Sequence, residues 1–170
     1  LADEMGLGKT LQSLAFLKTV VERRSEKSPS MIVCPTSLVF NWVAEAEKFT
    51  PELKVLALHG PRRQELFAKI PEVDLVVTSY ALIRRDAEQY RGMEFDTIAL
   101  DEAQHIKNRQ TQNAQAVKAI RSRNRFVLRG TPIENWVLDL WSIFDFLMPG
   151  YLGSATDFKE RYEGPIAREN

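Results

Sequence analysis

Short apolar runs alternate with amphipathic segments along almost the whole chain, and this alternation constrains the fold more than any other feature. Runs typical of buried strands occupy residues 31–34, 53–58, 74–78, 96–100 and 126–128. Helical patterns lie between them, at residues 10–24, 36–50, 62–70, 79–85, 114–120 and 136–147. The alternation predicts an α/β fold, in which parallel strands form one sheet and right-handed helical crossovers cover both of its faces.

Length, composition and charge narrow the class of protein. The chain has 170 residues, of which 44% are hydrophobic, which suits one globular domain with a substantial core. Lys plus Arg equals Asp plus Glu at 23 each, so no global field draws the protein to nucleic acid or membranes. Any contact with nucleic acid must therefore be local.

Several features bear on where such a protein works. The single cysteine, Cys34, lies in an apolar run, which argues against a disulfide framework and agrees with a reducing compartment. No run is long enough for a membrane span, so we expect an intracellular protein without a membrane partner, cytoplasmic or nucleoid-associated in bacteria and nuclear in eukaryotes. Because a phosphate loop normally follows a complete strand, we expect the first strand to lie upstream of Leu1.

A glycine-rich turn at residues 3–10 runs straight into the first helical pattern. It ends in Gly8-Lys9-Thr10, the end of a phosphate-binding loop whose backbone N–H groups surround anionic oxygens while the lysine reaches the terminal phosphates. The first turn of the helix adds unsatisfied N–H groups and a positive dipole. The full pattern has a further glycine where this chain has Asp3. The motif alone leaves two interpretations open, a polyphosphate site and an ordinary strand-to-helix turn.

Two carboxylates follow the fourth predicted strand, Asp101 and Glu102. Phosphoryl transfer from ATP needs a divalent ion and a group that orients or deprotonates water. By position, Asp101 would hold Mg²⁺ together with the Thr10 hydroxyl, and Glu102 would act as the general base. The alternative is that the pair only caps the helix that follows. Joined to a Gly-Lys-Thr loop in an alternating chain, the pair favours an ATPase site built from Lys9, Thr10, Asp101 and Glu102.

The ordered motifs of this chain resemble those of Swi/Snf-type ATPases, helicase-like motors of superfamily two. The matching segments are Asp3 to Gln12, Cys34 to Leu38 with Asn41-Trp42, Thr78 to Tyr80, Asp101 to Asn108, Gly130 to Asn135 and Leu140 to Leu147. The resemblance covers almost the entire chain. It also accounts for Asp3, because the loop of this family has an acidic residue there.

The resemblance implies the first of two RecA-like lobes of a double-stranded-DNA-dependent ATPase that moves along duplex and remodels protein–DNA complexes, with a DNA-bound protein as its substrate. ATP and Mg²⁺ would bind between the lobes, and the second lobe would supply arginine fingers, so efficient turnover needs that lobe. We expect residues 1–150 to form the ATP-binding lobe and residues 151–170 a helical extension. The nucleotide-binding residues are expected to be Met5, Gly6, Leu7, Gly8, Lys9 and Thr10.

The resemblance also suggests which residues meet DNA. Segments that follow strands and open helices suit phosphate oxygens, and the expected contacts are Thr36, Ser37, Ser79, Tyr80 and Arg84. Gly130 and Thr131 would couple the nucleotide site to DNA. Arg129 replaces the small hydroxyl residue usual in the family, so it either alters this coupling or forms a surface ion pair.

Two other functions remain open from the sequence. One is a true helicase of the same superfamily that separates DNA strands or acts on RNA. The other is a non-catalytic switch in which nucleotide binding only regulates a partner. The intact Lys9 and Glu102 argue against the switch.

Overall fold

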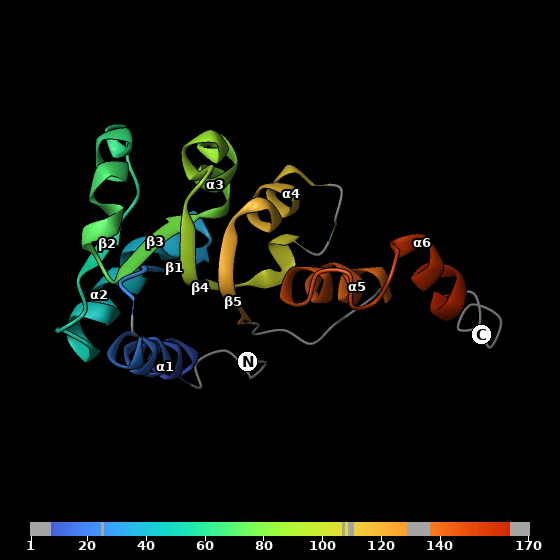
Figure 1. Cartoon of the computed structure of the whole chain (residues 1–170), viewed down its shortest axis with the longest axis horizontal. Helices are drawn as coiled ribbons and strands as arrows, with labels where there is room; N and C mark the ends of the chain where they lie inside the picture. Colours follow the sequence, from blue (N-terminus) through green and yellow to red (C-terminus); the bar gives the residue numbers. More distant parts are fainter. Residues whose placement is uncertain (1–7, 25, 107, 109–110, 129–136, 164–170) are drawn as a thin grey trace.

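The computed structural model describes residues 8–24, 26–106, 108, 111–128 and 137–163. Within them, one parallel sheet has the strand order β2-β3-β1-β4-β5 (Figure 1). Its strands are β1 Ser30–Cys34, β2 Val55–Ala57, β3 Leu75–Ser79, β4 Glu94–Leu100 and β5 Arg121–Val127. The predicted parallel sheet is confirmed.

The two central strands explain why the apolar runs are continuous. β1 pairs with β3 from Ser30↔Leu75 to Cys34↔Ser79, and with β4 from Met31↔Ile98 to Val33↔Leu100. Every residue of β1 and β3 is buried. A strand with neighbours on both sides and helices over both faces has no side open to water, so most of its positions carry apolar side chains, and the polar residues Ser30, Thr78 and Ser79 lie toward the strand ends.

Two edge strands differ from their predicted lengths. β2 is shorter than the predicted run of residues 53–58. β5 is longer than the predicted run of residues 126–128, because it begins at Arg121. Among the described residues it pairs only with β4, and its first residues are largely exposed. The polar start of β5 is compatible with an edge position, where one side of the strand faces solvent.

Helices cover both faces of the sheet, as predicted. On one face, α1 Lys9–Arg23 and α2 Val39–Phe49 pack on alternate strand residues such as Ile32 and Val77. On the other face, the intervening residues, such as Val33 and Val76, contact a second core cluster. That cluster is built by α3 Tyr80–Arg85, α4 Gln112–Ala119 and α5 Val137–Leu147 with the short helices η2 Arg63–Glu72, η3 Ala87–Tyr90 and η4 Ala103–Ile106. The period of two along each strand separates the two cores.

The predicted helix at residues 62–70 is a run of 3-10 turns, η2, which contains Pro71. A buried ion pair holds it against the end of α3. Arg63 donates from Nε to Oδ2 of Asp86 (2.6 Å) and from an Nη atom to Oδ1 (2.8 Å). The Gln64 amide donates to the same Oδ1 at 2.8 Å. The Asp86 side chain is only 2% exposed, so this contact replaces the hydration that the carboxylate has in water.

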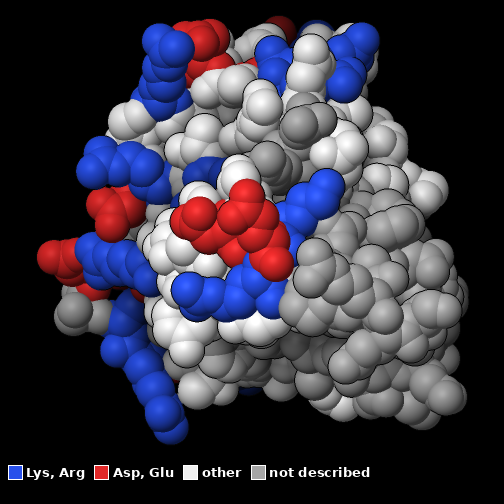
Figure 2. All heavy atoms as spheres, turned by 90° about the vertical axis from the view of Figure 1, so that its right-hand side faces the viewer, with Lys and Arg blue, Asp and Glu red and all other residues white. Residues whose placement is uncertain are grey.

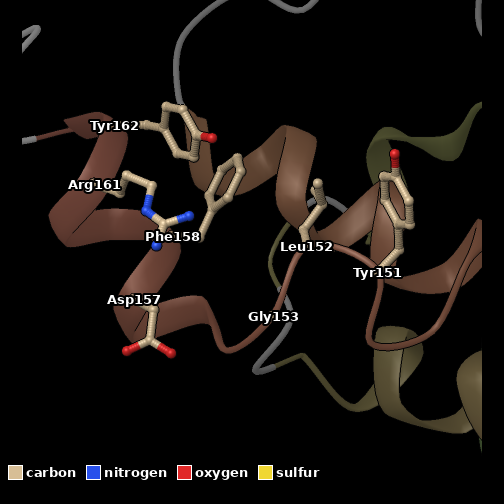
Figure 3. Close-up of a pocket in the computed structure, with 7 residues that line it drawn as sticks. All are labelled: Tyr151, Leu152, Gly153, Asp157, Phe158, Arg161 and Tyr162. Carbon is tan, nitrogen blue, oxygen red and sulfur yellow. The ribbon is translucent and has the colours of Figure 1, made fainter.

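The chain beyond α5 forms α6 Ala155–Phe158 and η5 Lys159–Glu163. Trp141 of α5 packs with Ala155 and Phe158. A hollow of about 470 Å³ lies beside this contact. Phe158 and Tyr162 line it, and their ring centroids are 4.7 Å apart (Figure 3). The domain boundary at residue 150 stays a prediction.

Charge on the described surface is mixed. Figure 2 shows basic and acidic side chains interspersed on the described part of one face of the molecule, without a broad patch of one sign. This distribution agrees with equal numbers of acidic and basic residues in the sequence. No helix in the described part of the chain is long and apolar enough to cross a membrane.

Candidate functional site

β4 ends at Leu100, so Asp101 lies at the carboxyl edge of the sheet, and α1 packs in the same core cluster as β4. The positive charge of Lys9 acts on the carboxylate of Asp101 and lowers its pKa, although other groups have larger effects on that pKa. This interaction brings together two residues that are far apart in the sequence. In a parallel α/β sheet, this edge is where ligands bind.

Gly8 gives the loop its turn into α1. Its φ of 81° lies in the left-handed region, which suits a residue without Cβ. Its carbonyl accepts the first helical hydrogen bond, from Gln12 N at 2.9 Å. The helix begins at Lys9, so Thr10 lies in its first turn, where backbone N–H groups lack helical acceptors. The predicted nucleotide-binding residues Met5, Gly6 and Leu7 lie outside the described residues.

Asp101 is a carboxylate held by two donors. Trp42 Nε1 donates to Oδ2 at 2.9 Å, and the backbone N–H of Glu102 donates to Oδ1 at 3.0 Å. Burial raises the pKa of Asp101 above its usual range, and the charge of Glu102 adds to the rise. The bond from Trp42, the N–H of Glu102 and the charge of Lys9 oppose it. A buried carboxylate of this kind gains stability from a nearby cation.

Glu102 lies on a tight turn between β4 and η4. Its φ is 51°, the only positive φ of a non-glycine residue in the described part of the chain. Its Oε2 accepts a bond from the Gln104 amide at 2.6 Å, and its side chain is partly exposed. Strained backbone of this kind costs about 1–3 kcal/mol and is common at functional sites. The carbonyl of Glu102 accepts a backbone bond from the N–H of His105 at 3.1 Å, whereas its carboxylate contacts Gln104, so capping of the helix by the carboxylates stays a prediction.

Two residues that contact the acidic turn were not recognised as such in the sequence. Trp42 lies in the predicted helix of residues 36–50, and the residue is only 2% exposed. Tyr80 was interpreted as a DNA contact, but its hydroxyl donates to the backbone carbonyl of Asp101 at 2.7 Å. Neither contact can be recognised from a local sequence pattern, because each joins residues that are distant in the sequence.

The predicted DNA contacts differ in exposure. Thr36 and Ser37 in η1 (Thr36–Leu38) and Arg84 in α3 are exposed. Ser79 is fully buried, but it lines a hollow of about 300 Å³ together with Thr36. Its hydroxyl has no hydrogen-bond partner among the described residues.

Tyr80 is 3% exposed, and this placement does not support direct contact of its side chain with DNA. The contact stays a prediction. The coupling residues Gly130 and Thr131, and Arg129 before them, lie outside the described residues.

The structure also bears on the reactivity of Cys34 and on metal binding. Cys34 is fully buried, and burial raises the pKa of its thiol to about 12, with a smaller contribution from the charge of Asp101. Such a thiol is inert at neutral pH. Within the described part of the chain, no group of three or more His, Cys, Asp or Glu residues could hold a metal ion. A Mg²⁺ site built around Asp101 would therefore take its other ligands from a hydroxyl, water and phosphate oxygens.

Replacing Trp42 by phenylalanine removes a donor from Asp101, so we expect the pKa of Asp101 to rise further. The raised pKa means that ionisation of Asp101 opposes folding above that pKa and has no effect well below it. The loss of stability should therefore be largest at neutral pH, about 1.5–3 kcal/mol for the lost bond, and should shrink as Asp101 becomes protonated. Urea unfolding at neutral pH and at pH values falling toward the ordinary carboxyl pKa of about 3.9 checks this.

Trp141→Phe is the matched control for that substitution. The Nε1 of Trp141 donates to the neutral carbonyl of Gly153 at 3.2 Å, so the loss of stability in Trp141→Phe should not change with pH. An equal pH dependence for both variants, or an unchanged Asp101 carboxyl titration by NMR in Trp42→Phe, would contradict the assignment.

Comparisons with known proteins agree with this geometry. The SNF2-related domain matches residues 1–170. The chain is 43% identical over 180 residues to the TATA-binding protein-associated factor mot1 of Schizosaccharomyces pombe, covering 98% of this chain and 9% of that protein. It is also 41% identical over 181 residues to the human TATA-binding protein-associated factor 172, covering 98% of this chain and 10% of that protein.

Solved structures give the same result. The SWI2/SNF2 ATPase core of Sulfolobus solfataricus in complex with dsDNA matches with a TM-score of 0.89 and 44% identity, covering 98% of this chain and 35% of that chain. A second structure, of the Sulfolobus solfataricus SWI2/SNF2 ATPase core domain, matches with a TM-score of 0.85 and 43% identity, covering 99% of this chain and 34% of that chain. The predicted RecA-like fold is confirmed. The chain spans 19% or less of the length of the curated relatives it matches first.

Proposed function

Because the chain belongs to the SNF2-related family of helicase-like ATPases, we propose that it is the ATP-binding lobe of a double-stranded-DNA-dependent ATPase that translocates along duplex and remodels protein–DNA complexes. The observation that carries the proposal is that α1, which begins at Lys9, packs in the same core cluster as β4, which ends directly before Asp101. A phosphate-loop lysine and a strand-end carboxylate at one edge of a sheet are the two halves of an ATP site.

The residues at this edge suit ATP and Mg²⁺. The hydroxyl of Thr10 and the carboxylate of Asp101 are hard oxygen ligands of the kind that Mg²⁺ prefers. The raised pKa of buried Asp101 would fall again beside a cation, which favours such a complex. When bound, Mg²⁺ neutralises charge on the terminal phosphates of ATP.

Each side chain then has a distinct role. Lys9 binds the terminal phosphates, and the N–H groups at the start of α1 bind phosphate oxygens. Trp42 orients Asp101 through its indole N–H. Glu102 takes the proton of the attacking water, and Gln104 orients the Glu102 carboxylate.

Double-stranded DNA is the proposed partner. The Sulfolobus ATPase core, whose lobe resembles this chain, was solved in complex with dsDNA. Thr36 and Ser37, which follow β1, and Arg84, which follows β3, are exposed, and the hydroxyl of Ser79 at the end of β3 has no hydrogen-bond partner among the described residues. Such groups bind phosphate oxygens without reading sequence. A second RecA-like lobe would complete the ATP site, and a DNA-bound protein is the proposed substrate.

ATP hydrolysis by the two-lobed protein tests the proposal. We expect duplex DNA to raise the rate at least about tenfold and single-stranded RNA to have little effect, because the DNA contacts follow the backbone of a duplex. The stimulation should weaken as salt increases, since phosphate contacts release counterions. Equal stimulation by RNA, or separation of strands in a displacement assay, would instead favour a helicase. Absence of turnover with DNA and Mg²⁺ would favour a regulatory switch.

A further inference from the structure

Tyr80 connects a segment after β3 with the turn that carries both acidic residues. It is the first residue of α3, directly after Ser79, and its side chain is buried. The hydroxyl donates to the backbone carbonyl of Asp101 at 2.7 Å. The ring stacks on His105 of η4, with centroids 5.0 Å apart and an interplanar angle of 23°. Tyr80 therefore contacts the acidic turn at its start and at the short helix behind it.

The carbonyl that Tyr80 holds belongs to the peptide plane between Asp101 and Glu102. The N–H of the same plane donates to the Asp101 carboxylate, which Trp42 holds in turn. Both polar groups of this plane are therefore fixed by side chains. The orientation of the plane sets ψ of Asp101 and φ of Glu102, and these two angles help to set the directions in which both side chains leave the backbone.

The turn needs such support because its backbone is strained. The left-handed φ of Glu102 persists only where surrounding contacts outweigh its cost. Burial raises the pKa of Tyr80 well above its usual value, and the charge of Asp101 adds to this, so the hydroxyl remains a donor at neutral pH. The hydrogen bond to Asp101 is then among the contacts that keep Glu102 in its conformation.

We propose that Tyr80 is a positioning residue, whose hydroxyl fixes the peptide plane between Asp101 and Glu102 and so aims the Glu102 carboxylate at the attacking water. This role rests on the proposed ATPase function. It also places one side chain between the Ser79 segment, a predicted DNA contact, and the proposed general base. A displacement of that segment moves the Tyr80 hydroxyl, and with it the turn.

Tyr80→Phe in the two-lobed protein tests the role, because it keeps the buried ring and its stacking on His105 and removes only the hydroxyl. We expect kcat with saturating duplex DNA to fall about 10–100-fold, since small misplacements of a reacting group have effects of this size. The KM for ATP should change less than about twofold, because Lys9 and Thr10 are untouched. A kcat within about twofold of the parent overturns the role.

Tyr90→Phe is the matched control. Tyr90 is also buried, and its ring packs between Phe67 and Phe95, away from the acidic turn. We expect its kcat and KM to match those of the parent protein. An equal loss of kcat in both variants would show a general effect on the fold and would overturn the assignment to Tyr80.

Amide hydrogen exchange gives a second measurement that needs no turnover. Loss of one buried hydrogen bond should speed exchange at Glu102 by about tenfold in Tyr80→Phe and leave it unchanged in Tyr90→Phe. If the parent protein hydrolyses no ATP, the proposed function fails, and exchange at Glu102 alone still decides whether Tyr80 holds the turn. Unchanged exchange in Tyr80→Phe overturns the inference whatever the ATPase activity.

Discussion

Replacing Glu102 by glutamine is expected to lower the rate of ATP hydrolysis by the two-lobed protein by about 10²–10⁴-fold, the usual contribution of a general base. Glutamine has nearly the same shape and still accepts the bond from Gln104, but it cannot take a proton from water. ATP affinity should change little, because Glu102 does not contact the phosphates in the proposed arrangement. Steady-state turnover and equilibrium binding of a fluorescent ATP analogue check the two parts separately.

Two variants make the result specific to the site. Lys9→Ala should weaken ATP binding itself, since it removes the cation that meets the terminal phosphates. Glu88→Gln removes a carboxylate whose side chain is 72% exposed and paired with Arg91, and it should leave both measurements unchanged. If Glu102→Gln kept the parent rate, Glu102 could not be the general base, and Asp101 or a residue of the second lobe would have to take that role.

Replacing Arg63 by alanine is expected to lower the free energy of unfolding by about 3–5 kcal/mol. The substitution leaves the Asp86 carboxylate buried with only the Gln64 amide as a side-chain donor, at 2.8 Å. A buried charge without its partner is among the largest single-residue costs. Because Asp86 follows α3 directly, we also expect faster amide exchange in that helix. Urea unfolding monitored by circular dichroism measures the change in stability.

Two comparisons separate the ion pair from other effects. Arg91→Ala removes an exposed pair with Glu88, in which the side chains are 78% and 72% exposed, and should have no measurable effect on stability. The double substitution Arg63→Met with Asp86→Leu replaces the pair by apolar side chains and should recover much of the loss. A loss for Arg63→Ala no larger than for Arg91→Ala would show that the pair does not stabilise the fold.

The Arg63 contact could not be predicted from the sequence, whereas its surroundings could. Residues 62–70 and 79–85 were both predicted to be helical. In the structure, Arg63 turns inward to Asp86. A pattern of charged residues marks a helix face that avoids the core, but it does not show which charged side chain has a buried partner elsewhere.

The acidic turn shows the same limit. The alternation of strands and helices predicted that Lys9, Thr10, Asp101 and Glu102 come to one edge of the sheet, and the interaction of Lys9 with Asp101 agrees with this. The contacts of Trp42 and Tyr80 with Asp101 were not predicted. They depend on the strand order β2-β3-β1-β4-β5, which places β1 between β3 and β4.

The sequence by itself determined the alternation of strands and helices, the helical cover on both faces of the sheet and the residue types of the loop and the acidic pair, because these follow from local periodicity and from residue type. Only the tertiary structure decided the polar edge strand β5, the buried pair of Arg63 with Asp86 and the support of Asp101 by Trp42 and Tyr80. Hydrogen bonds and ion pairs between distant residues have no periodicity in the sequence. They form only once packing of the sheet and helices has brought donors and acceptors within about 3 Å of each other.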